Sequence, residues 1–141
     1  TTMLLDRLDR ELRQAHDLSL PEYEILVRLS ESPDRTLRMA ALADAMAYSR
    51  SRITHTVARL ERAGLISRGE DPTDRRGVTA HLTDVGFDKL AAAAHTHVTG
   101  VREHLVDLAS DADFAAIGRA FDAVTDHLIT EHGPAADIRG C

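Results

Sequence analysis

A helix rich in arginine, serine and histidine is the part of this sequence best suited to chemistry. Ser49 is a residue type that caps helix starts and Gly64 is one that ends them, so a helix is predicted between the two. At helical spacing, Ile53, Val57 and Leu60 form one narrow apolar stripe that must pack inward. The opposite, outward side carries Ser51, Arg52, His55, Arg59 and Arg62.

Such an outward face is shaped to enter the major groove of double-stranded DNA. Arginine binds the acceptor edge of guanine there, and serine or threonine hydroxyls bind phosphates or base edges. The first turn, with Arg50 and Arg52, also offers free backbone N–H groups beside two cations, which suits a phosphate. Taken alone, the same pattern equally describes an ordinary charged surface helix.

A predicted β-hairpin adds a second arginine-rich element. Strand-like runs over residues 65–70 and 78–82 flank a polar turn over residues 71–77. The turn carries Arg75 and Arg76, which can reach a minor groove, where the negative potential attracts arginine. Asp74 is expected to hold the Arg76 side chain through a charge-assisted bond. A purely structural turn is an alternative, but its coincidence with the arginine-rich helix favours DNA binding.

The distribution of charge agrees with this interpretation. The chain of 141 residues has a formal charge of −6, which by itself argues against nucleic acid. Residues 36–82, however, hold eight arginines against five acidic residues, a net charge of +3, so the remainder carries −9. Because all eight basic residues are arginine, bidentate contact with phosphate and guanine is favoured over diffuse attraction.

The elements that must position these residues are mostly helical. Ser19, Pro21 and Glu22 have the types and spacing of a capping box with an early proline, which starts a helix. Thr83 and Ser110 are expected to begin two further, long helices. Apolar spacing places helices at residues 3–16, 20–31, 39–46, 49–63, 84–108 and from 111 onward, with a short extended piece at 36–38.

The two long helices also predict self-association. They are acidic and have more apolar positions than a small domain can cover, so a two-fold partner would bury the surplus. A plain monomeric core stays the alternative. The apolar lines are Phe87, Leu90, Ala94, Val98, Val101, Leu105 and Leu108 in the first helix, and Phe114, Ile117, Phe121, Val124 and Leu128 in the second.

An ordered set of residues from Leu42 to Gly86 resembles the MarR family of winged-helix regulators. The matching residues are Ser49-Arg50-Ser51, Ile53-Thr54, Val57, Arg59-Leu60-Glu61, Gly64-Leu65-Ile66, Arg68, Asp71-Pro72, Asp74-Arg75-Arg76-Gly77, Leu82-Thr83 and Gly86. The flanking helices agree in number and order. The expected fold is therefore mainly α with a small β-hairpin wing, a winged helix-turn-helix plus a helical dimerisation region in a single domain over residues 1–141.

The resemblance implies a homodimeric transcription regulator, more often a repressor, on a pseudo-palindromic DNA site. The dimerisation region would comprise residues 1–18 and 84–133, and the DNA-binding lobe residues 19–83. The family's first helix normally starts earlier, and the chain lacks an initial methionine, so missing N-terminal residues are expected. The DNA-binding residues are expected to be Ser49, Arg50, Ser51, Arg52, Thr54, His55, Arg59, Asp74, Arg75 and Arg76.

A small aromatic or phenolic effector between the dimer helices and the DNA lobe is also implied by the resemblance. Leu12, His16, Tyr23 and Leu26 are the expected lining, although we prefer to interpret them as core residues. The eight histidines lack the spacing of a chelating cluster, and no nucleophile or phosphate-loop motif occurs, so we expect no metal, no cofactor and no enzyme.

Two rival functions remain open from the sequence. One is a winged-helix module that docks proteins without binding DNA, and the other is a metal-gated regulator. No apolar run approaches the length of a membrane span, and the single cysteine, Cys141, cannot form an internal disulfide, so a cytoplasmic location is expected.

Overall fold

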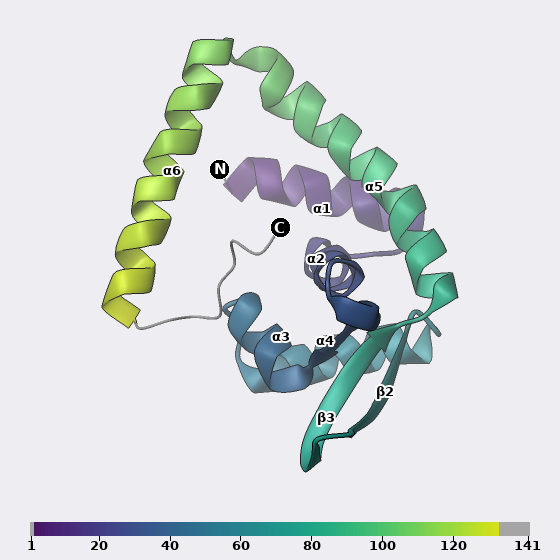
Figure 1. The fold of residues 1–141 in the computed structure, drawn as a ribbon. Helices are drawn as coiled ribbons and strands as arrows, with labels where there is room; N and C mark the ends of the chain where they lie inside the picture. The colour runs from purple at the N-terminus through teal and green to yellow at the C-terminus, as the bar shows by residue number, and fades with distance from the viewer. Residues whose placement is uncertain (1, 133–141) are drawn as a thin grey trace.

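An apolar core joins five helices to a small sheet in the computed structural model, which describes residues 2–132 (Figure 1). Thr1 and residues 133–141, with Cys141, lie outside this described part. The elements are α1 (Thr2–His16), α2 (Leu20–Ser30), η1 (Pro33–Arg35), β1 (Thr36–Arg38), α3 (Met39–Ala45), α4 (Arg50–Arg62), β2 (Ile66–Asp71), β3 (Asp74–Leu82), α5 (Asp84–His104), η2 (Val106–Leu108) and α6 (Asp111–His132).

The helix starts follow from the capping residues, as predicted. The Ser19 hydroxyl accepts a bond from the Glu22 amide, and the Glu22 carboxylate accepts one from the Ser19 amide, which completes the capping box. Ser49 caps α4, and Thr83 caps α5. Gly64 follows α4 with a φ of 74°, in the left-handed region that favours glycine at a helix end.

The sheet differs from the predicted two-stranded hairpin in two ways. β1 pairs with β3, so the sheet has three antiparallel strands in the order β1-β3-β2. The connection between β2 and β3 is also shorter than predicted, because β3 already begins at Asp74. The physical cause is the Asp71 carboxylate, which accepts bonds from the Thr73 amide and hydroxyl and closes the turn within two residues.

One helix boundary also differs from the sequence expectation. The helix predicted to run to Leu108 ends at His104, because Leu105 has non-helical φ and ψ angles of −137° and −63°. Leu108 therefore lies in η2 with 79% of its surface exposed. The direction of the chain changes at this break, and Figure 1 shows α6 standing apart from the core helices at an angle to α5.

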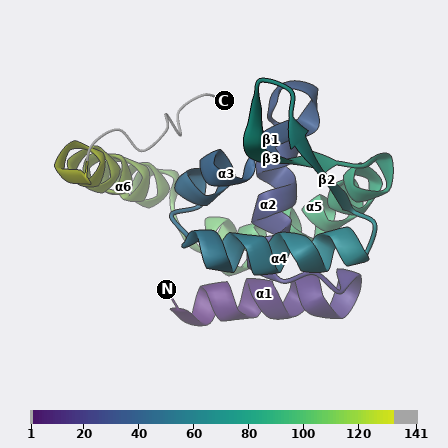
Figure 2. The ribbon, with the colours of Figure 1, turned by 90° about the horizontal axis from the view of Figure 1, so that it is seen from below.

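The core lies between the sheet and helices α1 to α5. Its fully buried members are Leu12, Ile25, Leu26, Leu29, Leu42, Ile53, Val57, Leu60, Ile66 and Leu82. Helix α2 contacts both α1 and α4, and Figure 2 shows α1 and the β2–β3 hairpin on opposite sides of the molecule with α6 projecting outward. The apolar line of α6, in contrast, is exposed along its length. No helix within residues 2–132 is both long and apolar enough to cross a membrane.

Candidate nucleic-acid interface

Helix α4 has the orientation that its apolar stripe predicted. Ile53, Val57 and Leu60 are at most 1% exposed and anchor the helix to the core. The other side of the helix is exposed, and its first turn is held open to solvent by the Ser49 cap, whose hydroxyl accepts a bond from the Arg52 amide at 3.2 Å. The exposed predicted residues on this side are Ser51, Arg52, Thr54, His55 and Arg59.

A concave surface joins α4 to the β2–β3 hairpin. Its volume is about 360 Å³, and its walls come from β1, α3, α4 and β3. It brings together four of the predicted site residues, Arg50 and Thr54 from α4 with Asp74 and Arg76 from β3. Residues far apart in the sequence therefore share one arginine-lined groove, which has the composition expected of a phosphate-binding surface.

Arg38 is a groove residue that the sequence reasoning did not select. Its Nε atom forms an ion pair with the buried carboxylate of Asp71, and its Nη2 atom donates to the Thr73 hydroxyl at 2.8 Å. The available signal was the extended piece at 36–38, because β1 pairs with β3 and places Arg38 opposite Thr79 at the base of the hairpin. Arg38 thus braces the hairpin against the DNA-binding lobe.

The Asp71 carboxylate is ionised under ordinary conditions. Hydrogen bonds from the hydroxyl and amide of Thr73, followed by the Arg38 guanidinium, lower the pKa of Asp71 to about 2. Its stabilising contribution is therefore complete above the ordinary pKa of 3.8 and is lost only as the pH falls toward 2. The ion pair between Arg38 and Asp71 is therefore present at neutral pH.

Asp74 acts on the backbone of the wing rather than on the Arg76 side chain. Its Oδ1 atom accepts a bond from the Arg76 amide at 3.0 Å, which corrects the expected pairing with the guanidinium. A short aspartate side chain reaches the amide two residues on more readily than it reaches a guanidinium directed outward. Among the described residues, the guanidinium groups of Arg75 and Arg76 have no ion-pair partner, and both side chains are exposed.

Arg52 is stacked on the aromatic ring of Tyr48, which directly precedes the Ser49 cap. The guanidinium carbon of Arg52 lies 3.6 Å from the centre of the Tyr48 ring. A cation over an aromatic face is attracted by the ring quadrupole, so Tyr48 restricts the Arg52 side chain before any ligand is present.

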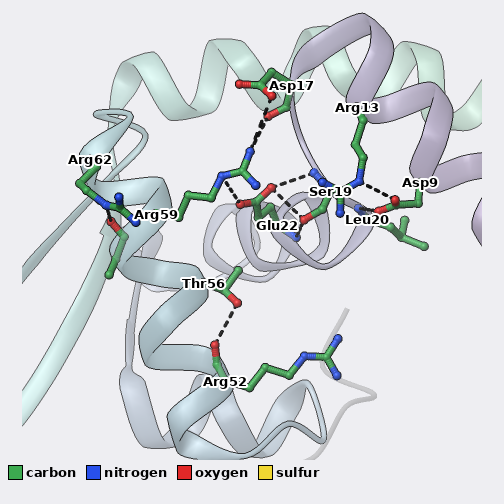
Figure 3. A network of polar contacts seen from close by, with 11 residues as sticks. Asp9, Arg13, Asp17, Ser19, Leu20, Glu22, Arg52, Thr56, Arg59 and Arg62 are labelled. Atoms are coloured by element: carbon green, nitrogen blue, oxygen red, sulfur yellow. Dashed lines mark hydrogen bonds and ion pairs between the residues drawn. The ribbon is translucent and has the colours of Figure 1, made fainter.

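Arg59 occupies a different position from the other predicted residues. Its Nε atom lies 3.1 Å from the Glu22 carboxylate, and its Nη2 atom donates to the Asp17 carbonyl at 3.4 Å (Figure 3). The side chain therefore points to the α1–α2 turn and away from the groove. The buried Glu22 carboxylate needs a cationic partner, and this need, which helical spacing does not reveal, directs the Arg59 side chain toward Glu22 although 44% of it stays exposed.

Comparisons with known proteins agree with this geometry. The model of the MarR family matches residues 16–77. AbsC, a MarR family transcriptional regulator from Streptomyces coelicolor, is 38% identical with a TM-score of 0.84, over 90% of this chain and 85% of AbsC. Sco3205, a MarR family regulator from the same organism solved in complex with DNA, is 38% identical with a TM-score of 0.88, over 97% and 84% of the two chains. This chain belongs to the MarR family.

Membership of the MarR family makes the chain a transcriptional regulator and not an enzyme. PecS, an HTH-type transcriptional regulator from Dickeya dadantii (strain 3937), is 30% identical over 102 residues, which are 72% of this chain and 61% of PecS. The chain spans less than two thirds of the length of PecS and of the other first curated relatives that it matches.

Of the four residues expected to line an effector cleft in this MarR-family chain, Leu12, Tyr23 and Leu26 belong to one apolar core and His16 does not. Leu12 and Leu26 are fully buried core residues. His16 lines a hollow of about 460 Å³ beside the end of α4, and its Nε2 atom lies 2.7 Å from the Thr96 hydroxyl. Tyr23 lines a separate hollow of about 550 Å³ between α2, α3 and α5. The preferred interpretation as core residues agrees with the burial of Leu12, Tyr23 and Leu26.

His97 is the residue of the Tyr23 hollow that the sequence reasoning passed over. Its ring centre lies 4.7 Å from that of Tyr23, and its buried Nδ1 atom has no hydrogen-bond partner among residues 2–132. Burial lowers the pKa of His97, which favours the neutral imidazole. Within the described part of the chain, no group of three His, Cys, Asp or Glu side chains could hold a metal ion.

Proposed function

We propose that this MarR-family protein is a sequence-specific regulator that binds double-stranded DNA as a homodimer on a pseudo-palindromic operator. The observation that carries the proposal is the groove in which Arg50 and Thr54 of α4 face Arg76 of β3. This arrangement suits α4 for a major groove and the β2–β3 hairpin for the adjacent minor groove. The proposed DNA-binding residues are Ser49, Arg50, Ser51, Arg52, Thr54, His55, Asp74, Arg75 and Arg76, with Asp74 acting through the wing backbone.

The exposed apolar line of α6 supports the homodimer. Its members are between 39% and 63% exposed in the isolated chain, and Met3 and Leu5 of α1 are 85% and 55% exposed. Such a continuous apolar surface is unusual in a soluble monomer and is typical of an interface. We propose residues 1–18 and 84–133 as the dimerisation region and residues 19–83 as the DNA-binding lobe. We propose repression as its mode of action on family grounds alone.

Arg76→Ala is expected to weaken binding to most DNA sequences and to reduce its dependence on salt. The slope of log K against log salt should become shallower by about 0.9 for each phosphate that the protein no longer neutralises, which is one phosphate per protomer. The operator is first selected from a random DNA pool with the unmodified chain. Fluorescence anisotropy then measures affinity for operator and random duplex over a range of salt concentrations.

Arg102→Ala is the matched control, because Arg102 is an exposed arginine of α5 that pairs with Asp107. Its affinity and salt slope are expected to match those of the unmodified chain. An unchanged slope in Arg76→Ala would contradict the wing assignment. Failure of the unmodified chain to enrich any sequence would instead favour the protein-docking alternative.

A second part of the proposal is a small aromatic or phenolic effector that releases the operator. The hollow between α2, α3 and α5 has a volume of about 550 Å³, within the range of small-molecule sites, and is lined by Tyr23, Arg28, Met46 and His97. A ligand ring can stack on Tyr23 beside the His97 ring, whose buried Nδ1 atom has no hydrogen-bond partner among the described residues. Arg28 lines the hollow together with the carboxylates of Glu24 and Glu31.

His97→Phe is expected to remove the response to such an effector while leaving operator binding intact. At a ligand concentration ten times Kd, binding to the folded chain adds about 1.4 kcal/mol of stability. Thermal denaturation with a panel of hydroxybenzoates and hydroxycinnamates measures this gain. His95→Phe, a change at an exposed position of the same helix, serves as the control and should keep the response. A panel without any stabilising member, or a response unaffected by His97→Phe, would contradict the assignment.

A further inference from the structure

We propose that Glu22 and Arg59 are a positioning pair that sets the orientation of α4, so that Glu22 determines DNA specificity without facing the DNA. This inference rests on the proposed DNA-binding function. It changes the role of Arg59 from the expected DNA contact to a partly exposed anchor for the buried Glu22 carboxylate. It also assigns a function to a buried carboxylate on α2 that the groove itself does not use.

The Glu22 carboxylate is fully engaged in the interior. Glu22 is 2% exposed, and its Oε2 atom accepts bonds from the amide and the hydroxyl of Ser19, both at 2.8 Å. Its Oε1 atom faces the Arg59 Nε atom at 3.1 Å. Each carboxylate oxygen therefore has a partner, and Arg59 is the cation that balances the buried charge. The pair ties the start of α2 to the second half of α4.

The turn that receives Arg59 is itself held in place. Asp17 has a φ of 51°, which directs its carbonyl toward Arg59, and that carbonyl accepts a bond from Nη2. On the other side of the turn, Asp9 of α1 accepts bonds from the Leu20 amide at 2.7 Å and from the Arg13 Nε atom at 2.6 Å. Figure 3 shows these contacts as one network that runs from α1 through the turn to α4.

The position of Arg59 on α4 connects this network to the groove. Arg52, His55 and Arg59 follow one another at steps of three and four residues, so they lie along one strip of the helix. Arg59 is held at one end of the strip by Glu22, whereas Arg52 and His55, at the other end, have no ion-pair partner among the described residues. A rotation of α4 that broke the Arg59 contacts would carry Arg52 and His55 with it. Base contacts tolerate displacements of only about 0.5 Å, so such a rotation would reduce specificity.

The test compares Glu22→Gln, Arg59→Met and the double variant in the full chain. Glu22→Gln keeps the size of the side chain but turns an amide N–H₂ or an uncharged oxygen toward Arg59. Affinity for the selected operator and for random duplex is measured at several salt concentrations. Each single variant is expected to bind the operator with an affinity about tenfold or more lower, and to bind random DNA with nearly unchanged affinity. The slope of log K against log salt should not change. The double variant should bind the operator no more weakly than the single variant with the lower affinity, because the two residues act as a unit.

Matched controls separate this effect from simple loss of charge. Glu31→Gln removes an exposed carboxylate at the C-terminal end of α2, and Arg102→Met removes an exposed arginine of α5 that pairs with Asp107. Both controls should retain the ratio of operator to random affinity to within about threefold of the parent, since surface changes usually cost less than about 0.5 kcal/mol. Arg59→Lys keeps the charge and can still meet Glu22, so it is expected to recover most of the specificity lost in Arg59→Met.

Three outcomes would overturn the positioning role. A reduced salt slope in Arg59→Met, with normal binding by Glu22→Gln, would make Arg59 a phosphate contact. Equal losses on operator and random duplex, in step with a lower Tm, would make the pair merely structural. Unchanged specificity in Glu22→Gln and Arg59→Met would leave the pair without a role in recognition. If the unmodified chain itself does not prefer the operator, the proposed function fails before any variant is compared.

Discussion

Gly86→Ala is expected to destabilise the folded chain by about 3 kcal/mol or more, a large cost for one methyl group. A Cβ atom on Gly86 would lie 2.1 Å from the carbonyl oxygen of Leu65 and 2.7 Å from the Leu82 side chain. The nearest obstacle is backbone, which cannot turn aside as the end of a flexible side chain can. The first turn of α5 would have to lift away from the strand.

The Leu65 carbonyl cannot move freely because it is already part of the α5 cap. It accepts a bond from the Thr83 amide at 3.1 Å and another from the Thr83 hydroxyl at 3.1 Å. The same hydroxyl accepts a bond from the Gly86 amide at 3.0 Å. Displacing α5 would therefore weaken the cap and the contact with the sheet together.

Thermal denaturation measures the effect of Gly86→Ala. For a domain of this size, a loss of about 3 kcal/mol lowers Tm by about 10 °C. Gly69→Ala is the matched control, because its Cβ atom would meet only the Thr79 hydroxyl at an ordinary 3.6 Å, and replacement of glycine in a strand interior generally favours the folded state. If Gly86→Ala melted within about 2 °C of the parent chain, the close approach of α5 to Leu65 would be wrong.

The double variant Ile117→Glu/Phe121→Glu is expected to dissociate the proposed homodimer and to lower operator affinity by about a hundredfold or more. Ile117 and Phe121 are 39% and 63% exposed in the isolated chain, so two glutamates there cost the protomer little. In the dimer, they would place charges without partners in an apolar interface. Loss of the partner removes one of the two half-site contacts, and linked sites gain about 10² to 10⁴ in avidity.

Sedimentation equilibrium and operator anisotropy, measured on the same samples, check the role of α6. Arg119→Glu is the control, because it introduces the same residue on the same helix but off the apolar line. This control should stay dimeric. A double variant that remained dimeric would exclude α6 as the interface. A parent chain that bound the operator tightly as a monomer would contradict the homodimer itself.

The exposed apolar line of α6 could be predicted from the sequence, but the requirement for glycine at position 86 could not. The apolar line of α6 is visible in the spacing of its residues, and the structure adds that the line is exposed. The requirement for glycine at position 86, in contrast, exists only because α5 starts directly against the Leu65 peptide. A glycine in the first turn of a helix does not by itself indicate that another backbone segment lies close to it.

The sequence alone determined the local features of this protein. Caps at Ser19, Ser49 and Thr83, and the inward stripe of α4, depend on residues three or four positions apart, whose relative placement a helix fixes by itself. The MarR-like order of elements follows from these same local signals. The outward direction of the α4 face could therefore be predicted before any tertiary contact was known.

Only the tertiary structure decided which distant residues meet. The pairing of Arg38 with Asp71, the capture of Arg59 by Glu22, and the separation of His16 from Tyr23 all depend on how helices and strands pack across one another. A charged side chain goes to the buried group that most needs a partner, and the identity of that group is set by packing rather than by spacing along the chain. Helical periodicity placed Arg59 on an exposed face of α4, but the buried carboxylate of Glu22 determined its direction.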